Sequence, residues 1–359
     1  MSGTSPYPPS PVPPVGGPAP VPLSEAEVAA AYPPLEYHQL HRAGDRGWWR
    51  PLLGVVAVVV GMQVLLPLGI LALFVGGLAA TGAGSDAIDA LLDSDDLQPL
   101  TLAYLMVSLA LLTPLVWLVT RVLHGLRPRW TTSVAPRMRW AFFAACMALS
   151  VVALLASMVV SVLVASIDPH ALPGESEVGG LNAFTATTRD FLLVIVLLTP
   201  LQAAGEEYLF RGYLTQVAGG IFSRPAVART VAVVAPALLF ALAHGAQDPA
   251  VFFDRFAFGL AAGVLVILTG GLEAGIALHV MNNWFAFGLA LAFGDMSTVL
   301  TPTGGSWLSI PVTLTQELVF LGLALAVHRG MGLARHADSA VLIRSRGRVY
   351  GFSSAPKGP

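Results

Sequence analysis

The chain has 359 residues, of which 55% are hydrophobic and 11% are charged, and its mean hydropathy is +0.72. A soluble core of this length would carry far more charge, so the composition excludes an ordinary soluble domain and predicts an all-α polytopic membrane protein. The net charge of −2 gives no sign of a nucleic-acid partner.

Polar tails flank the apolar part of the chain. The first 34 residues contain 11 of the 27 prolines and no lysine or arginine, which is typical of a partly polyproline II tail and unlike a signal peptide. We therefore expect a disordered, proline-rich cytoplasmic tail over residues 1–47, a transmembrane domain over 48–329 and a basic cytoplasmic tail over 330–359. Three arginines of that last tail would lie near anionic lipid headgroups: Arg344, Arg346 and Arg348.

Eight apolar runs between the tails are long enough to cross a bilayer at about 1.5 Å of rise per residue. They cover residues 52–80, 99–120, 140–165, 190–218, 229–247, 251–269, 272–293 and 307–328. We therefore expect about eight transmembrane helices. The fourth run is the least regular, because it contains the Thr199–Pro200 step and the Gly219–Gly220 pair. The single cysteine, Cys146, lies inside the third run, which excludes a disulfide framework.

The distribution of charge predicts the orientation of these helices. If the N-terminus is cytoplasmic, 16 of the 19 basic residues fall on the cytoplasmic side, only Arg189 and Arg255 fall outside, and Arg211 lies within a helix. The acidic residues gather on the opposite side: Asp86, Asp89, Asp93, Asp95, Asp96, Glu175 and Glu177. Because cytoplasmic loops of membrane proteins are enriched in basic residues, both termini are predicted to be cytoplasmic.

Three short motifs place ionisable side chains inside apolar runs. They are Glu206-Glu207-x-x-x-Arg211, Phe240-x-x-x-His244 and His279-x-x-x-Asn283. Charged groups are costly in hydrocarbon and normally face a partner, a cavity or a reaction, so a cluster on three helices indicates a functional site. We interpret this cluster as an intramembrane active site within a cavity that the helices enclose.

The spacing suggests a division of roles between the two adjacent glutamates. Glu207 can pair with Arg211 four residues later, whereas Glu206 is rotated by about 100° and stays available as a general base. Peptide hydrolysis needs an activated water, a proton carrier and donors for the oxyanion, and Glu206, His244 and the His279/Asn283 pair could supply them. At about 1.5 Å per residue, His279 lies shallower in the membrane than the other three, so we expect a tilted helix or a shifted boundary there.

In this order on membrane segments, the three motifs resemble those of the CPBP family, which comprises the CAAX proteases and the bacteriocin-processing enzymes also called Abi proteins. The resemblance covers about residues 190–295. It implies an intramembrane endopeptidase in which the residues matching Glu206 and His244 activate the attacking water. Those matching His279 and Asn283 would hold the oxyanion, and those matching Glu207 and Arg211 would support the site.

The chemistry of the site leaves a metal as an alternative. Glu206, His244 and His279 could form a His₂Glu zinc site with an open fourth position. We favour a metal-independent glutamate mechanism with no cofactor, because the motifs lack the compact two-histidine helix of common zinc peptidases and Asn283 is better suited to an oxyanion than to zinc.

Two other function classes use the same residues: a transporter or proton-coupled channel, and a catalytically silent immunity or scaffold protein. The expected partners are membrane lipids and a membrane-associated protein or peptide substrate. The abundance of arginine and alanine beside a single lysine, Lys357, indicates a GC-rich genome and a bacterial plasma membrane. Glu317, in the last run, has no counterpart in the motifs and is interpreted as a structural acid. Glu273 and His328, near helix ends, are given no role.

Overall fold

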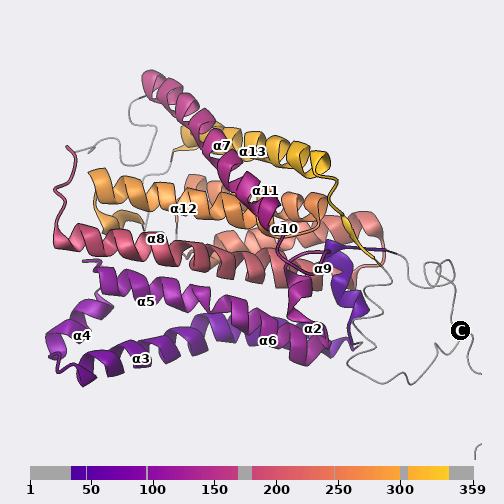
Figure 1. Cartoon of the computed structure of the whole chain (residues 1–359), viewed down its shortest axis with the longest axis horizontal. Helices are drawn as coiled ribbons and strands as arrows, with labels where there is room; N and C mark the ends of the chain where they lie inside the picture. The colour runs from indigo at the N-terminus through magenta and orange to yellow at the C-terminus, as the bar shows by residue number, and fades with distance from the viewer. Residues whose placement is uncertain are drawn as a thin grey trace, which may run out of the picture.

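The computed structural model of the protein describes residues 34–45, 47–93, 96–168, 180–245, 247–299 and 306–338, without the side chains of 298 and 299. Figure 1 shows long helices that run roughly side by side along the horizontal axis. Most of the predicted N-terminal tail and of the basic C-terminal tail, including Arg344, Arg346 and Arg348, lies outside the described residues.

The described part contains eight helical stretches that are long and apolar enough to cross a membrane, which confirms the all-α polytopic fold. The first four consist of α2 (Trp49–Val60), η2 (Gly61–Leu65) and α3 (Leu66–Ala80); α5 (Pro99–Ala110) and α6 (Leu112–His124); α7 (Trp140–Ile167); and α8 (Ala186–Glu207), η5 (Tyr208–Leu214) and α9 (Thr215–Ile221). The others are α10 (Pro225–Ala243); α11 (Pro249–Thr269); α12 (Glu273–Phe293); and η7 (Trp307–Ser309) with α13 (Ile310–Gly330). Each contains or overlaps a predicted run, and the ends differ by only a few residues.

Three of the spanning stretches are interrupted. The second breaks at Leu111, shortly before Pro114, whose ring cannot accommodate the carbonyl of Ala110 four residues earlier. The first and fourth contain wider π-helical turns, η2 and η5. In the fourth stretch the irregularity lies directly after Glu207 and not at the expected Pro200 or Gly219, and π turns of this kind often mark functional sites.

Short elements join the long helices. Helix α4 (Ser85–Leu92) connects α3 to α5 at the left of Figure 1 and lies in the predicted acidic outer loop, where the sequence indicated no helix. The remaining turns are η3 (Pro128–Thr131) and η6 (Met296–Val299).

Glycines allow the helices around the site to approach closely. A Cβ atom at Gly205 would lie 2.1 Å from the carbonyl oxygen of Leu109, so α8 presses directly against the α5–α6 junction. At Gly259 a Cβ atom would lie 2.8 Å from the Cβ of Ala237, which brings α11 against α10. Small residues at such crossings are typical of membrane helices, whose association depends on close packing.

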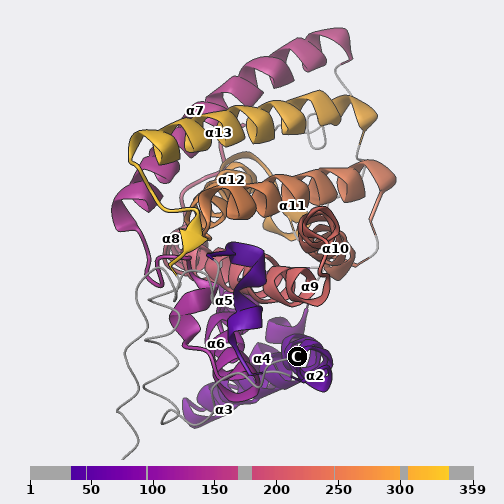
Figure 2. The same ribbon diagram turned by 90° about the vertical axis from the view of Figure 1, so that its right-hand side faces the viewer.

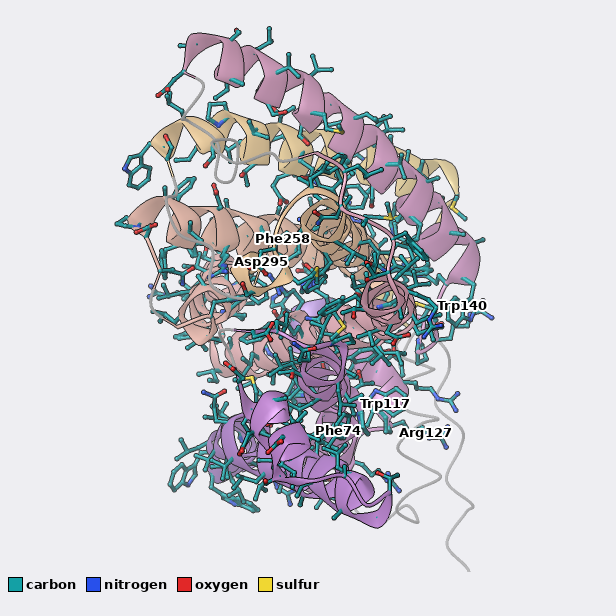
Figure 3. All side chains as sticks on the ribbon, turned by 90° about the vertical axis from the view of Figure 1, so that its left-hand side faces the viewer. Phe74, Trp117, Arg127, Trp140, Phe258 and Asp295 are labelled. Carbon is teal, nitrogen blue, oxygen red and sulfur yellow. The ribbon has the colours of Figure 1, made fainter. Side chains whose placement is uncertain are left out.

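The surface of the bundle suits a lipid environment. Many leucine and valine side chains of the spanning helices are exposed, among them Leu73, Val162 and Leu197. Figure 3 views the bundle from the left-hand side of Figure 1, with Trp140 at its edge and Phe258 in its interior. Trp140, at the start of a span, is 69% exposed, as expected of an anchor at the membrane interface.

The structure departs from the predicted tails near both of their inner ends. Leu35–Glu36 (β1) pairs antiparallel with His336–Ala337 (β2), and the chain continues into the 3-10 helix η1 (Tyr37–Ala43). Tyr37 and Leu40 are fully buried, and the Tyr37 hydroxyl donates to the carbonyl of Thr131. Figure 2 shows this segment lying across the end of the bundle. Apolar side chains in an otherwise polar tail therefore fold it onto the membrane domain.

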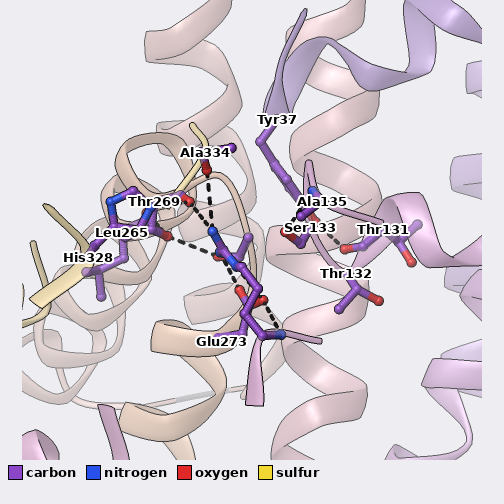
Figure 4. Close-up of polar contacts among 12 residues, drawn as sticks. Tyr37, Thr131, Thr132, Ser133, Ala135, Leu265, Thr269, Glu273, His328 and Ala334 are labelled. Carbon is purple, nitrogen blue, oxygen red and sulfur yellow. Dashed lines mark hydrogen bonds and ion pairs between the residues drawn. The ribbon is translucent and has the colours of Figure 1, made fainter. Parts of the chain in front are cut away.

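A buried ion pair closes the same end of the molecule. Two nitrogens of the Arg139 side chain donate to Glu273, Nε to Oε1 at 2.8 Å and Nη2 to Oε2 at 2.6 Å. Nη1 of Arg139 donates to the carbonyl of Thr269 at 2.9 Å, and His328 contacts the same carbonyl (Figure 4). Glu273 and His328 therefore hold helix ends together, a structural role that the sequence analysis did not assign to them.

Candidate active site

The three motifs lie on three neighbouring membrane helices. Glu206 and Glu207 are the last residues of α8, directly before the π-helical turn that contains Arg211. Phe240 lies in the last turn of α10 and His244 caps that helix, while His279 and Asn283 lie on successive turns of α12. Packing of α12 against α8 and of η5 against α10 brings these segments together.

Glu207 is the centre of a buried ionic cluster. Its Oε1 accepts from Nη1 of Arg211 at 2.9 Å and lies 3.1 Å from Nδ1 of His279. The guanidinium of Arg211 stacks 4.1 Å from the ring centroid of Phe240. A Cβ atom at Gly275 would lie 2.8 Å from Oε2 of Glu207, so this glycine leaves room for the carboxylate. The predicted pair of Glu207 and Arg211 is present, and Glu207 also contacts His279, the first residue of the third motif.

Glu206 has a separate set of contacts. Its Oε1 accepts from Nε2 of Gln202 at 2.9 Å, and its Oε2 lies 3.5 Å from Nε2 of His279. The side-chain amide oxygen of Gln202, Oε1, in turn accepts from Nδ2 of Asn283 at 2.9 Å. Gln202 therefore connects Glu206 to Asn283. The sequence analysis missed it, although its position four residues before Glu206 on one helix face could have revealed it.

His279 joins the two carboxylates. One ring nitrogen faces Glu207 and the other faces Glu206, and the ring is buried between Phe240 and Phe258. The shallower depth expected for His279 does not prevent this contact. A ring fixed on both sides in this way cannot turn freely, so its position relative to both glutamates is set by the fold.

His244 lies at the open end of the cluster. It is exposed, its ring packs edge-on against Phe240, and its Nδ1 lies 2.8 Å from the carbonyl oxygen of Phe240. Because a carbonyl only accepts, Nδ1 must be the donor, which leaves Nε2 of the neutral ring as a proton acceptor. Within the described chain His244 makes no hydrogen bond to the motif residues of the other two segments, but Glu206 is near enough for its charge to act on a protonated His244 ring.

The structure thus brings five predicted residues into one connected network and leaves the sixth at its edge. Glu206, Glu207, Arg211, His279 and Asn283 are linked through side-chain contacts and through Gln202. The site is not sealed, because His244 is exposed and Asn283 is half-buried.

Further polar residues surround the network. Glu317, on α13, is buried near Arg211 and Glu207, and its Oε2 has no hydrogen-bond partner within the described chain. The neighbouring Gln316 donates to Oδ1 of Asn282 on α12. These contacts fix α13 against the helix that carries His279 and Asn283.

The zinc alternative on Glu206, His244 and His279 stays a prediction. Across the described ranges, no three side chains of histidine, cysteine, aspartate or glutamate are gathered as metal ligands would be. His279 turns Nε2 toward Glu206 and Nδ1 toward Glu207, and a carboxylate on the second ring nitrogen is also the usual outer partner of a metal-bound histidine.

Comparison with known proteins agrees with the motifs. Residues 188–285 match the family model described as Type II CAAX prenyl endopeptidase Rce1-like. The matched segment contains all three motifs, which confirms the family resemblance and supports an intramembrane endopeptidase.

One curated relative covers most of the chain. It is the uncharacterized protein YyaK of Bacillus subtilis (strain 168), 26% identical over 301 residues, which are 80% of this chain and 94% of that protein. No solved structure matches the chain.

Proposed function

We propose that the protein is a metal-independent intramembrane endopeptidase in which Glu206 and His244 activate the attacking water and His279 and Asn283 stabilise the oxyanion. Its substrate is a membrane-associated protein or peptide. Glu207 and Arg211 support the site without touching the substrate.

The different environments of the two adjacent glutamates carry this proposal. Glu207 is fully buried and is neutralised by Arg211, whereas Glu206 receives its contacts from the neutral amide of Gln202 and from His279. A purely structural ion pair needs only one of the two carboxylates. The second one, beside an imidazole and near an exposed histidine, is suited to general-base chemistry.

The residues permit a balanced hydrolytic cycle. Glu206 takes a proton from a water molecule, and the water oxygen attacks the carbonyl carbon of the scissile peptide bond. The oxyanion that forms accepts hydrogen bonds from Asn283, whose amide nitrogen has a second hydrogen besides the one donated to Gln202, and from His279. The peptide C–N bond then breaks, and the proton held by Glu206 or His244 passes to the leaving amine.

The membrane setting follows from the fold and the charge distribution. The eight apolar helices support an integral membrane protein. We place it in a bacterial plasma membrane with both termini in the cytoplasm, because the described arginines lie mainly at the end where η1 and β2 pack.

Comparison of protein termini in cells tests this function. Cells that produce the wild type, Glu206→Gln or Glu206→Ala would be analysed by N-terminal proteomics, with Asp86→Asn, an exposed acid on α4, as the matched control. We expect a set of new termini in membrane-associated proteins that is present with the wild type and the control and is lost with both Glu206 variants.

The same experiment can contradict the proposal. If equal amounts of wild-type and Glu206 variant protein in the membrane give the same termini, the protein is not this protease. Glu206-dependent flux of protons or solutes in proteoliposomes, without any cleavage, would instead identify a transporter.

A further inference from the structure

Arg255 is a cation on the side of the molecule where basic residues are rare. Of the 19 basic residues, only Arg189 and Arg255 are predicted to lie at the outer ends of the helices. Arg189 is exposed and pairs with Asp190 at 2.8 Å. Arg255, in the second turn of α11, is half-buried, and within the described chain no carboxylate lies within 4.0 Å of its guanidinium.

The guanidinium of Arg255 is nevertheless held in place. Its Nη1 donates to Oε1 of Gln247 at 2.6 Å. Nε2 of Gln247 donates to the carbonyl of Ala241 at 2.7 Å, which ties the pair to the C-terminal end of α10. The preceding residue, Asp254, accepts from the Ser309 hydroxyl at 3.2 Å, which ties α11 to η7 at the start of the last spanning stretch. Arg255 is therefore fixed by a neutral amide beside the helix end that His244 caps.

Its position places this charge at the open end of the candidate site. The charge of Arg255 interacts with those of both Glu206 and His244, which come from two other helices. It thus lies beside the exposed His244 and apart from the buried cluster around Glu207 and Arg211.

Among the described residues, the half-buried guanidinium of Arg255 makes no ion pair, and the charges of Glu206 and Asp254 act on it only at longer range, so it is incompletely satisfied. Burying a charge costs free energy unless an opposite charge and hydrogen bonds compensate for it. Arginine presents five N–H donors in a planar fork that matches a carboxylate, and Gln247 engages Nη1 alone. A ligand carboxylate would complete the interaction and would leave Glu206 to its contacts with Gln202 and His279.

We propose that Arg255 binds a carboxylate of the peptide substrate and thereby positions the scissile bond against Glu206 and His244. This inference rests on the proposed endopeptidase function and adds a substrate class to it: peptides with a negative charge close to the cleavage site. The carboxylate can be the C-terminus of the substrate or an aspartate or glutamate side chain, and the two sources are separable by experiment.

The test begins with the cellular termini that depend on Glu206. Their sequences would be synthesised as quenched fluorescent peptides in three forms: with the native carboxylate, with a C-terminal amide, and with asparagine or glutamine at the nearest acidic residue. The full-length protein in proteoliposomes would cleave them as wild type, Arg255→Gln and Arg255→Lys. Arg189→Gln serves as the matched outer-side control.

For the wild type, we expect one of the two neutralised forms to lower kcat/KM by about 10- to 100-fold, mainly through KM, as the loss of a charge-assisted hydrogen bond predicts. Arg255→Gln should lose the same factor on the native peptide and should no longer distinguish it from the neutral form. Arg255→Lys should recover part of the activity, and Arg189→Gln should retain all of it. The form that matters identifies the source of the carboxylate.

Two results would overturn the inference. One is a wild type that cleaves all three forms equally, which needs no variant and so does not depend on the folding of Arg255→Gln. The other is an Arg255→Gln variant whose kcat/KM on the native peptide equals that of the wild type. In that second case, dependence of cleavage on anionic lipid in the vesicles, instead of on peptide charge, would assign Arg255 to a lipid headgroup. An absence of Glu206-dependent termini would contradict the protease function itself, which is a distinct outcome.

Discussion

At the scale of single residues, the candidate site depends on how two adjacent carboxylates are separated. The 100° turn between neighbouring helical residues sends Glu207 toward Arg211 and His279 and leaves Glu206 with Gln202. Gln202 is the residue that links the first motif to Asn283 of the third. If substitution of Gln202 lowers the rate of cleavage, these residues act as one network; if it does not, the polar contacts are independent of one another.

Substitution across this network should give graded losses of cleavage. We expect Glu206→Gln to lower kcat by about 10²- to 10⁴-fold and Asn283→Ala by about 10²- to 10³-fold, as for a lost general base and a lost oxyanion donor. Alanine at His244 or His279 should also lower cleavage by orders of magnitude. Gln202→Leu, which removes two hydrogen bonds without removing a reacting group, should cost about 10-fold.

Cleavage of a defined peptide by purified protein in proteoliposomes measures these effects, and Asp86→Asn is the control for an acid distant from the site. Near-normal turnover by both His244→Ala and His279→Ala, with intact protein in the membrane, would contradict the proposed roles.

Metal content and the effect of a chelator distinguish a glutamate mechanism from a zinc mechanism. If Glu206 acts as a base, the purified protein should contain far less than one zinc ion per chain by mass spectrometry, and treatment with a chelator should leave cleavage unchanged. Stoichiometric zinc, with activity lost on its removal and restored on its return, would make Glu206, His244 and His279 metal ligands instead.

At the scale of elements, the N-terminal segment Leu35–Ala43 is held to the bundle partly by buried histidines. The ring of His41 stacks on that of His124 at 4.1 Å, and His38 packs against the backbone of α9 at Gly219. Burial lowers the pKa of His38 to about 4 and that of His41 well below its ordinary value. Arg42 and Arg229 also disfavour the protonated form of His38, whereas Glu36 favours it.

Docking of this segment should therefore weaken in acid. In the released segment both histidines would titrate near pH 6.5, so below that pH the released state binds protons that the docked state does not. Each histidine then costs about 1.4 kcal/mol per pH unit until its docked pKa is reached. Proteolysis within residues 35–45 should be slow at pH 7.5 and faster at pH 5.5.

A matched variant isolates the cause of this dependence. His41→Phe keeps a ring against His124 and removes one titrating group, so its pH dependence should be shallower than that of the wild type. Equal dependence in the two proteins would assign the effect to other groups.

At the scale of the whole molecule, the two ends of the bundle differ in the elements and charged residues that they carry. One end carries the Arg139–Glu273 pair and the β1–β2 contact, and the other carries α4 and the open side of the candidate site near His244. If both termini are cytoplasmic, as we propose, the site opens away from the cytoplasm.

Labelling of single cysteines tests this orientation. Cys146 is fully buried, so the wild type should react little with a membrane-impermeant maleimide. In intact cells, Asp86→Cys should be labelled and Arg224→Cys should be labelled only after the membrane is permeabilised, since both positions are exposed at opposite ends. The reverse pattern would invert the topology and place the open side of the site in the cytoplasm.

The sequence by itself determined the features that depend on local spacing and composition. Apolar length predicted all eight spanning helices, because a bilayer sets the length of a helix that crosses it. The i, i+4 rule predicted the Glu207–Arg211 pair for a similar reason, since helix geometry alone places these side chains together.

Only the tertiary structure decided which groups meet between helices. The bridge from Glu206 through Gln202 to Asn283, the burial of Glu273 with Arg139 and the docking of Tyr37 each join residues at least 77 positions apart in the chain. Such contacts depend on how each helix is rotated about its axis and how deep it lies in the membrane. Neither quantity can be predicted from an apolar sequence, because similar apolar residues occupy all faces of the helix. The packing of the helices fixes both quantities, and with them the position of Arg255 beside the end of α10.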